Sequence, residues 1–168
     1  MKKIAICLCL LAVLCLTACD PGDYTFDREE YIGKVISVEL IEYDNPDIGF
    51  LDKQEGAVPF DFTKMTVLEI LPEEKISSFV EDFLELGYMR PWNDSDSPIG
   101  ICIKVNKDDG DFLILGSAGE DSWIDGYGHR CVCVYGEDGQ VKEFIGSFQR
   151  GDDLLELINQ YFETQVNE

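Results

Sequence analysis

The chain has 168 residues, and its 34 acidic side chains against 13 basic ones give a formal net charge of −21 at pH 7. Such a charge repels DNA, RNA and anionic lipid headgroups, so we expect no nucleic-acid partner. Apolar residues are frequent and neither a low-complexity segment nor a fixed-period repeat occurs, which indicates a globular domain rather than a disordered chain or a solenoid.

The first nineteen residues have the pattern of an export signal. Lys2 and Lys3 precede an apolar run of thirteen residues, from Ile4 to Leu16, and the run ends close to Cys19. Its length lies within the range of about 7–15 residues of a secretory core, and below the roughly 20 residues of a membrane-spanning helix. We therefore predict that residues 1–18 are a signal peptide that is removed.

The segment Leu16-Thr17-Ala18-Cys19 resembles the lipobox of bacterial lipoproteins. The resemblance implies that cleavage before Cys19 leaves a lipid-bearing cysteine as the first residue of the mature protein. The protein would then be anchored to membrane lipid on the extracytoplasmic side, in the bacterial cell envelope. The alternative is a signal peptide that is cleaved after Ala18 without lipidation, or an uncleaved anchor, with Cys19 as an ordinary cysteine.

The remaining chain divides into a short tether and one domain. Residues 19–31 are polar and contain Pro21 and Gly22, which is typical of a tether of modest reach. Residues 32–168 have the length of a single globular domain with its own core. Removal of residues 1–18 takes away two lysines and no acid, so the charge of the mature chain becomes −23.

The first half of the domain predicts two strands and a helix. Residues 34–43 alternate between apolar and polar side chains as a half-buried strand does, residues 44–61 form a long irregular connection, and residues 65–71 are a second strand. Pro72 suits the first position of a helix, and Gly87 suits its left-handed cap. Apolar residues at helical spacing form the buried stripe of that helix: Ile76, Phe79, Val80, Phe83 and Leu84.

The second half predicts two hairpins and a helix. Residues 99–105 and 112–115 flank a polar turn that contains Gly110, and residues 130–135 and 141–148 flank a turn with Asp138-Gly139 at its tip. Asp152 is expected to cap the last helix. That helix has a broad apolar face made by Leu154, Leu155, Leu157, Ile158, Tyr161 and Phe162.

Consecutive hairpins favour an antiparallel sheet, whereas alternating strands and helices would favour a parallel one. The sequence therefore predicts an α+β fold of two layers. We expect a mostly antiparallel sheet of about five to six strands with two helices on one face, in the order β-β-α-β-β-β-β-α.

Three cysteines remain in the mature domain besides Cys19. An odd number permits at most one disulfide, and the candidates join Cys102 to Cys131 or to Cys133 across neighbouring strands. An anaerobic habitat would instead leave all three as buried small apolar residues.

Metal binding has weak support in the sequence. His129, Cys131 and Cys133 alternate along one predicted strand and so share a face, but no fourth ligand is visible. Two acidic segments, 93–98 and 107–111, lack the spacing of an EF-hand and are better explained as turns. We therefore predict no metal site and no cofactor.

Aromatic residues in loops are the remaining candidates for ligand binding. Trp92 follows the first helix, and Trp123 and Tyr127 lie between the two hairpins, beside glycine and acidic residues. Exposed rings next to carboxylates can stack on a sugar, a peptide or a cation. The alternative is that the tryptophans point inward and close the ends of the sheet.

No phosphate loop, nucleophile elbow, zinc-protease helix or Cys/His nucleophile signature occurs in the sequence. We therefore predict a non-enzymatic binding or interaction domain, with a cationic protein or a small ligand as partner. The first alternative is an inhibitor or immunity-type protein that acts on a basic secreted enzyme or toxin. The second is a carboxylate-dependent hydrolase of cell-wall polymers.

Overall fold

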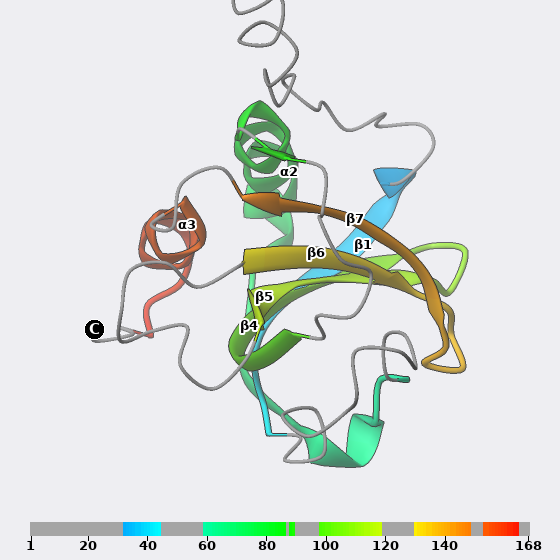
Figure 1. Ribbon diagram of the computed structural model, residues 1–168. Helices are drawn as coiled ribbons and strands as arrows, with labels where there is room; N and C mark the ends of the chain where they lie inside the picture. The colour runs from blue at the N-terminus through cyan, green and yellow to red at the C-terminus, as the bar shows by residue number, and fades with distance from the viewer. Residues whose placement is uncertain are drawn as a thin grey trace, which may run out of the picture.

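A computed structural model of the protein describes residues 32–44, 59–86, 88–89, 98–118, 130–148 and 153–164 (Figure 1). Within these ranges the chain forms one sheet, two α-helices and two short 3-10 helices. The strands are β1 (Val35–Tyr43), β2 (Met65–Ile70), β3 (Tyr88–Met89), β4 (Pro98–Lys107), β5 (Phe112–Ala118), β6 (Arg130–Tyr135) and β7 (Val141–Phe148). The helices are η3 (Phe62–Lys64), η4 (Glu73–Lys75), α2 (Ile76–Glu85) and α3 (Asp153–Tyr161).

The sheet has the strand order β2-β1-β4-β5-β6-β7-β3, and each of its pairings is antiparallel. The strands from β4 to β7 form the two predicted hairpins in sequence, and β1 lies between β2 and β4. The α+β fold is confirmed. The sheet has seven strands in the described ranges because the two-residue β3 pairs with β7, and so short a strand leaves no periodic pattern in the sequence.

Both predicted hairpin turns contain a glycine in the left-handed region. Gly110 has φ of 90° in the turn between β4 and β5, and Gly139 has φ of 80° in the turn between β6 and β7. Only glycine adopts these angles without a steric cost from Cβ. The turn chemistry read from the sequence therefore agrees with the backbone.

One face of the sheet is covered by both helices (Figure 1). Buried side chains of α2 and α3 belong to the same apolar cluster as alternate residues of β1, β4, β5 and β6. Phe79, Val80 and Phe83 point inward from α2, as the stripe predicted. Leu154, Leu157 and Ile158 do the same from α3.

The helix α2 begins later than predicted. Pro72 has an extended ψ of 139°, and the chain first forms the 3-10 turn Glu73–Lys75 before the α-helix starts at Ile76. The two residues expected to cap the helices, Gly87 and Asp152, lie outside the described residues.

The two helices are also joined by an aromatic contact and by hydrogen bonds. The ring of Phe79 meets that of Tyr161 edge to face, with centroids 5.3 Å apart. Next to it, Asp82 accepts hydrogen bonds from the Tyr161 hydroxyl and from Gln160 Nε2. Asp82 is partly exposed, and these hydrogen bonds link α2 to α3.

The opposite face of the sheet is covered by a short segment, residues 59–64. The Phe60 ring stacks on Tyr43 with centroids 4.3 Å apart and meets Phe112 and Tyr135 edge to face at 5.2 and 5.5 Å. These rings, with Ile114 and other buried residues, form a second core cluster. The Asp61 N–H donates to the Tyr43 hydroxyl at 3.0 Å, which fastens the segment to β1.

Candidate functional site

The sequence-predicted site residues lie largely outside the part of the chain that the structure describes. This holds for the lipidation residue Cys19 with its preceding signal, and for the loop aromatics Trp92, Trp123 and Tyr127. Those assignments stay predictions.

The cysteine residues are placed more fully. Cys102 on β4 and Cys133 on β6 are buried thiols of the second core cluster, and no disulfide joins these two. The prediction that Cys102 and Cys133 lie on neighbouring strands is wrong, because β5 lies between β4 and β6. Two strand spacings amount to roughly 9–10 Å, and a disulfide needs Cα atoms within about 7 Å. The side chain of Cys131 lies outside the description, so its pairing stays untested.

Metal ligation finds no support in the described ranges, which contain no group of three or more His, Cys, Asp and Glu side chains able to hold an ion. His129 falls outside them. The acidic turn at residues 107–111 lies within the described ranges, and its carboxylates form ion pairs with lysine side chains.

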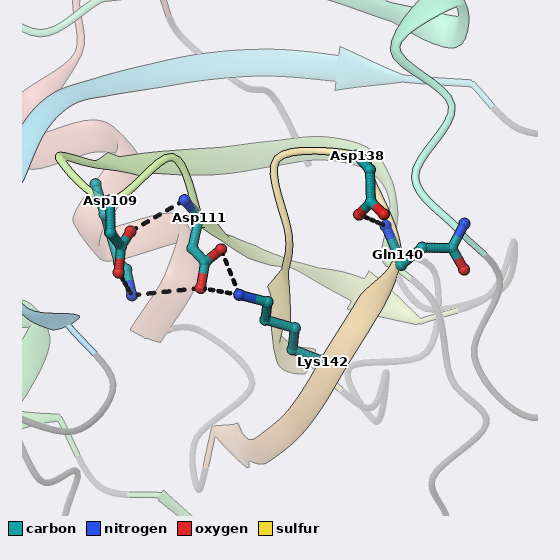
Figure 2. Close-up of polar contacts among 6 residues, drawn as sticks. Asp109, Asp111, Asp138, Gln140 and Lys142 are labelled. Atoms are coloured by element: carbon teal, nitrogen blue, oxygen red, sulfur yellow. Dashed lines mark hydrogen bonds and ion pairs between the residues drawn. The ribbon is translucent and has the colours of Figure 1, made fainter.

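The two hairpin turns come together at one end of the sheet. Phe112, the first residue of β5, pairs with Tyr135, the last residue of β6. The turn that precedes β5 and the turn that follows β6 are therefore neighbours (Figure 2). We call residues 107–111 and 136–142 the hairpin tips. They carry five acidic residues and two lysines.

The first tip is organised around two lysines. Lys107 is buried at 7% exposure, and its Nζ lies 3.1 Å from Asp109 Oδ2 and 3.9 Å from Asp111 Oδ2. Lys142, from the second hairpin, places its Nζ 2.6 and 2.7 Å from the two carboxylate oxygens of Asp111 (Figure 2). Asp111 thus joins a lysine of its own hairpin to a lysine of the other.

The backbone of both tips is held by carboxylates that accept from nearby N–H groups. Asp109 Oδ1 accepts from the Asp111 N–H at 3.0 Å, and Asp138 Oδ1 accepts from the Gln140 N–H at 3.0 Å. Both are local Asx-type contacts that stabilise turns. A Cβ on Gly110 would lie 3.3 Å from Glu137 Oε2, so the two tips are in close contact.

The second tip is fastened to the segment that closes the aromatic face. The Phe60 N–H donates to the Gly139 carbonyl at 2.7 Å. A Cβ on Gly139 would lie 2.5 Å from the Phe60 carbonyl oxygen, so this close approach requires glycine. The hairpin tips and the aromatic cluster therefore depend on each other through one pair of residues.

The surroundings of Asp109 and Lys142 favour the charged form of each side chain at neutral pH. Partial burial pushes the pKa of Asp109 up, but the contacts with Lys107 and with the Asp111 N–H outweigh it, and the pKa lies below its ordinary value of 3.8. The hydrogen bond to Asp111 raises the pKa of Lys142 above 10.5. Both groups are thus more firmly ionised than in an unfolded chain.

An open pocket of about 520 Å³ lies between the tips. Its lining is polar and mostly acidic: Asp109, Asp111, Gly136, Glu137, Asp138 and Lys142. Lys142 is 56% exposed at its side chain, so its ammonium group stands between the carboxylates and solvent. The pocket presents oxygen acceptors to a ligand that carries amino or guanidinium groups.

Neither a family model, nor a curated protein, nor a solved structure matches this chain. Among the described helices, none has the length and apolar character needed to cross a bilayer.

The sequence predicts that residues 107–111 form a turn. It did not predict that this turn contacts the turn of the second hairpin. A signal was present, because consecutive hairpins in one sheet bring alternate turns to the same end. Two acidic turns at such positions therefore predict a shared acidic surface.

Proposed function

We propose that the protein is a lipid-anchored extracytoplasmic binding domain whose hairpin tips hold basic groups of a partner protein. The export signal and the lipobox-like segment ending at Cys19 support the location. The observation that carries the binding proposal is the joint acidic surface made by the two hairpin tips, with five acids against two lysines.

The ion pairs that Lys107 and Lys142 make within the hairpin tips support this proposal. Lys142 is exposed and reaches Asp111 from the neighbouring hairpin with both carboxylate oxygens in range. Exposed pairs of this kind contribute little to folding stability. A lysine or arginine of a partner can therefore pair with Asp109, Glu137 and Asp138, or replace Lys142 at Asp111, at low cost.

Charge gives such a domain a kinetic advantage as well. A chain with a net charge of −21 attracts a basic protein over distances of about a Debye length, roughly 8 Å at physiological salt. Complementary charge raises the association rate more than it lowers the dissociation rate. Attachment to a membrane would keep this surface at a fixed place in the envelope.

An inhibitor or immunity-type protein is the second candidate, and the same acidic surface favours it. It differs from a simple binding domain in one respect, because the basic partner would lose its enzymatic or toxic activity on binding. A carboxylate-dependent hydrolase calls for an acid with a raised pKa. The acids with a resolved shift in the described ranges, Asp61, Glu69 and Asp109, have lowered pKa values instead.

The binding proposal is tested with a fluorescent octalysine peptide and the full chain in non-ionic detergent. The triple variant Asp109→Asn, Glu137→Gln, Asp138→Asn removes three charges, and asparagine keeps the turn acceptor at Asp109 and Asp138. We expect the dissociation constant at low salt to rise about fivefold or more, since exposed pairs each contribute up to about 1 kcal/mol.

The matched control is Glu74→Gln, Glu81→Gln, Glu85→Gln, which removes the same charge from exposed positions in and before α2. Its dissociation constant should rise less than twofold. Equal weakening of both variants would show that octalysine responds to net charge alone, and the hairpin tips would lose their assigned role.

A further inference from the structure

We propose that the edge of the sheet formed by β1 and β2 is a second interaction surface, which binds an aliphatic segment of a basic protein. It is distinct from the hairpin tips and goes beyond the function proposed for them. In the described ranges, every large apolar side chain that is strongly exposed comes from residues 36–70. These side chains are Ile36, Phe62, Val67, Leu68 and Ile70, with exposures from 39% to 62%.

Two irregularities in the strands bring aliphatic side chains to this edge. On β2 the register shifts so that Leu40 faces Glu69 while Ile41 faces Val67, and Leu68 is the extra residue. On β1, Val35 faces Lys107 while Ser37 faces Asn106, and Ile36 is the extra residue. β-bulges commonly redirect a side chain at sheet edges and beside functional sites. Here both redirect a large aliphatic residue.

In the described part of the molecule, the hydrogen bonds between β2 and the segment after α3 run from Glu163 and Thr164 to the Glu69 side chain, and the apolar side chains of this edge stay exposed. β2 is the terminal strand of the sheet, and its pairing with β1 ends at Ile70 opposite Glu39. Val67 and Ile70 are 42% and 62% exposed, although soluble proteins usually bury such residues. Contiguous exposed apolar patches on soluble proteins commonly mark interaction sites.

A pocket beside the start of β1, on the helix-covered face of the sheet, offers a place for one aliphatic side chain. It has a volume of about 540 Å³ and lies between the start of β1 and the start of α2. Val35, Ile36, Ile76 and Val80 form its apolar part, and Lys34 and Glu73 are among its charged residues. Interfaces typically gain most of their affinity from a few side chains inserted into such pockets.

The charges around the edge decide which occupant fits. Residues 34–44 and 64–74 hold six acids and two lysines. Two of these acids have partners already. Lys104 Nζ lies 3.4 Å from Glu39 Oε2. Glu69 accepts hydrogen bonds from Glu163 and Thr164 and is attracted by Lys75. The remaining excess of carboxylates favours a basic partner and opposes both an anionic bilayer and a second copy of a chain with a net charge of −21.

The test compares two fluorescent peptides of equal charge, (Lys-Leu)₄ and (Lys-Ser)₄, with the full chain in non-ionic detergent. We expect (Lys-Leu)₄ to bind at least about tenfold more tightly, because burying each leucine removes apolar surface from water. The double variant Val67→Ser, Ile70→Ser should lose this preference and keep its affinity for (Lys-Ser)₄. Ile36→Ser should reduce the preference, since Ile36 lines the pocket.

A second variant keeps the test valid if the double variant misfolds. If the double variant fails to show the wild-type thermal transition, Leu68→Ser at the bulge measures the same preference at a position that pairs with no residue of β1. The hairpin-tip triple variant should weaken both peptides by the same factor. Failure of the two proposals can therefore be told apart.

Three results would overturn this assignment. The first is equal affinity of the wild type for both peptides. The second is a concentration-dependent dimer of the wild type that Val67→Ser, Ile70→Ser abolishes, which would make a second copy the occupant. The third is binding of the detergent-free, unlipidated Cys19→Ser chain to phosphatidylcholine vesicles through the same residues, which would make the bilayer the occupant.

Discussion

The two faces of the sheet are closed in different ways. Two helices cover one face, where the core cluster is mostly aliphatic and draws on six different strands and helices. Among the described residues, one short segment, 59–64, packs on the other face, where four aromatic rings gather around Phe60. In this part of the chain the helix side holds the larger buried cluster, so we expect substitutions there to cost more stability. The described core of the aromatic side consists of few residues. Its segment 59–64 also contacts the hairpin tips, through the hydrogen bond from Phe60 to Gly139.

The largest expected effect separates the two faces directly. Leu113 and Ile114 are neighbours on β5, both fully buried, and they point to opposite faces. Leu113→Ala should lower the free energy of unfolding by about 4 kcal/mol and Ile114→Ala by about 2–3 kcal/mol, since a cavity costs less where the covering segment can collapse into it. Urea unfolding measures both. A larger loss for Ile114→Ala would contradict the comparison.

The connection between the aromatic face and the hairpin tips is tested at Gly139. Gly139→Ala should cost about 1–3 kcal/mol, because alanine there is strained and its Cβ meets a backbone carbonyl. Gly110→Ala is the matched control, with a similar φ of 90° but only the movable Glu137 side chain nearby. It should cost less in the same urea experiment. If the two variants cost the same, the contact between Gly139 and Phe60 is not what fixes the second tip.

The acid titration of Asp109 tests the ion pairs of the first tip. Its folded pKa lies below 3.8, so the stability it contributes is complete above the unfolded pKa and is lost as the pH falls through the folded pKa. Carboxyl-detected NMR should find the lowered value. Lys107→Met should raise the Asp109 pKa towards its ordinary value, and an unchanged pKa would show that Lys107 Nζ does not act on this carboxylate.

The smallest expected effect belongs to Lys142. Its pKa lies above 10.5, so its contribution is complete below the unfolded pKa and is lost as the pH rises through the folded pKa. Lys142→Met should leave the melting temperature nearly unchanged at pH 7, since the Lys142 side chain is exposed and Asp111 keeps Lys107 Nζ at 3.9 Å. The same variant should bind octalysine more tightly, because the competing internal cation is gone. Weaker binding would contradict the view that Lys142 occupies a site meant for a partner.

Periodic elements were predictable and contacts between distant elements were not. The stripe at Phe79, Val80 and Phe83 and the glycines of both hairpin turns follow from local rules, so α2 and the strands β4 to β7 were predicted. The strand β3 is too short to leave a pattern. The placement of β5 between β4 and β6 follows from hairpin order, and it separates Cys102 from Cys133, so the prediction that these cysteines lie on neighbouring strands was wrong.

The candidate site was only partly predictable for a related reason. Asp109 and Asp138 were identified as turn residues from their own neighbours in sequence. Their joint surface, and the reach of Lys142 to Asp111 across 31 residues, depend on the pairing of Phe112 with Tyr135. Exposed bulge residues such as Ile36 and Leu68 carry no sequence signal, because an alternating strand does not reveal where its register will shift.

The proposed function depends most on the lipid anchor, and metabolic labelling tests it directly. Wild-type chain and Cys19→Ser would be expressed in a bacterial host supplied with radioactive palmitate, and the mature N-terminus would be identified by mass spectrometry. The wild type should incorporate label and begin at Cys19, whereas the variant should stay unlabelled. An unlabelled wild type, or a mature chain that begins at another residue, would contradict the envelope location and the anchored binding domain with it.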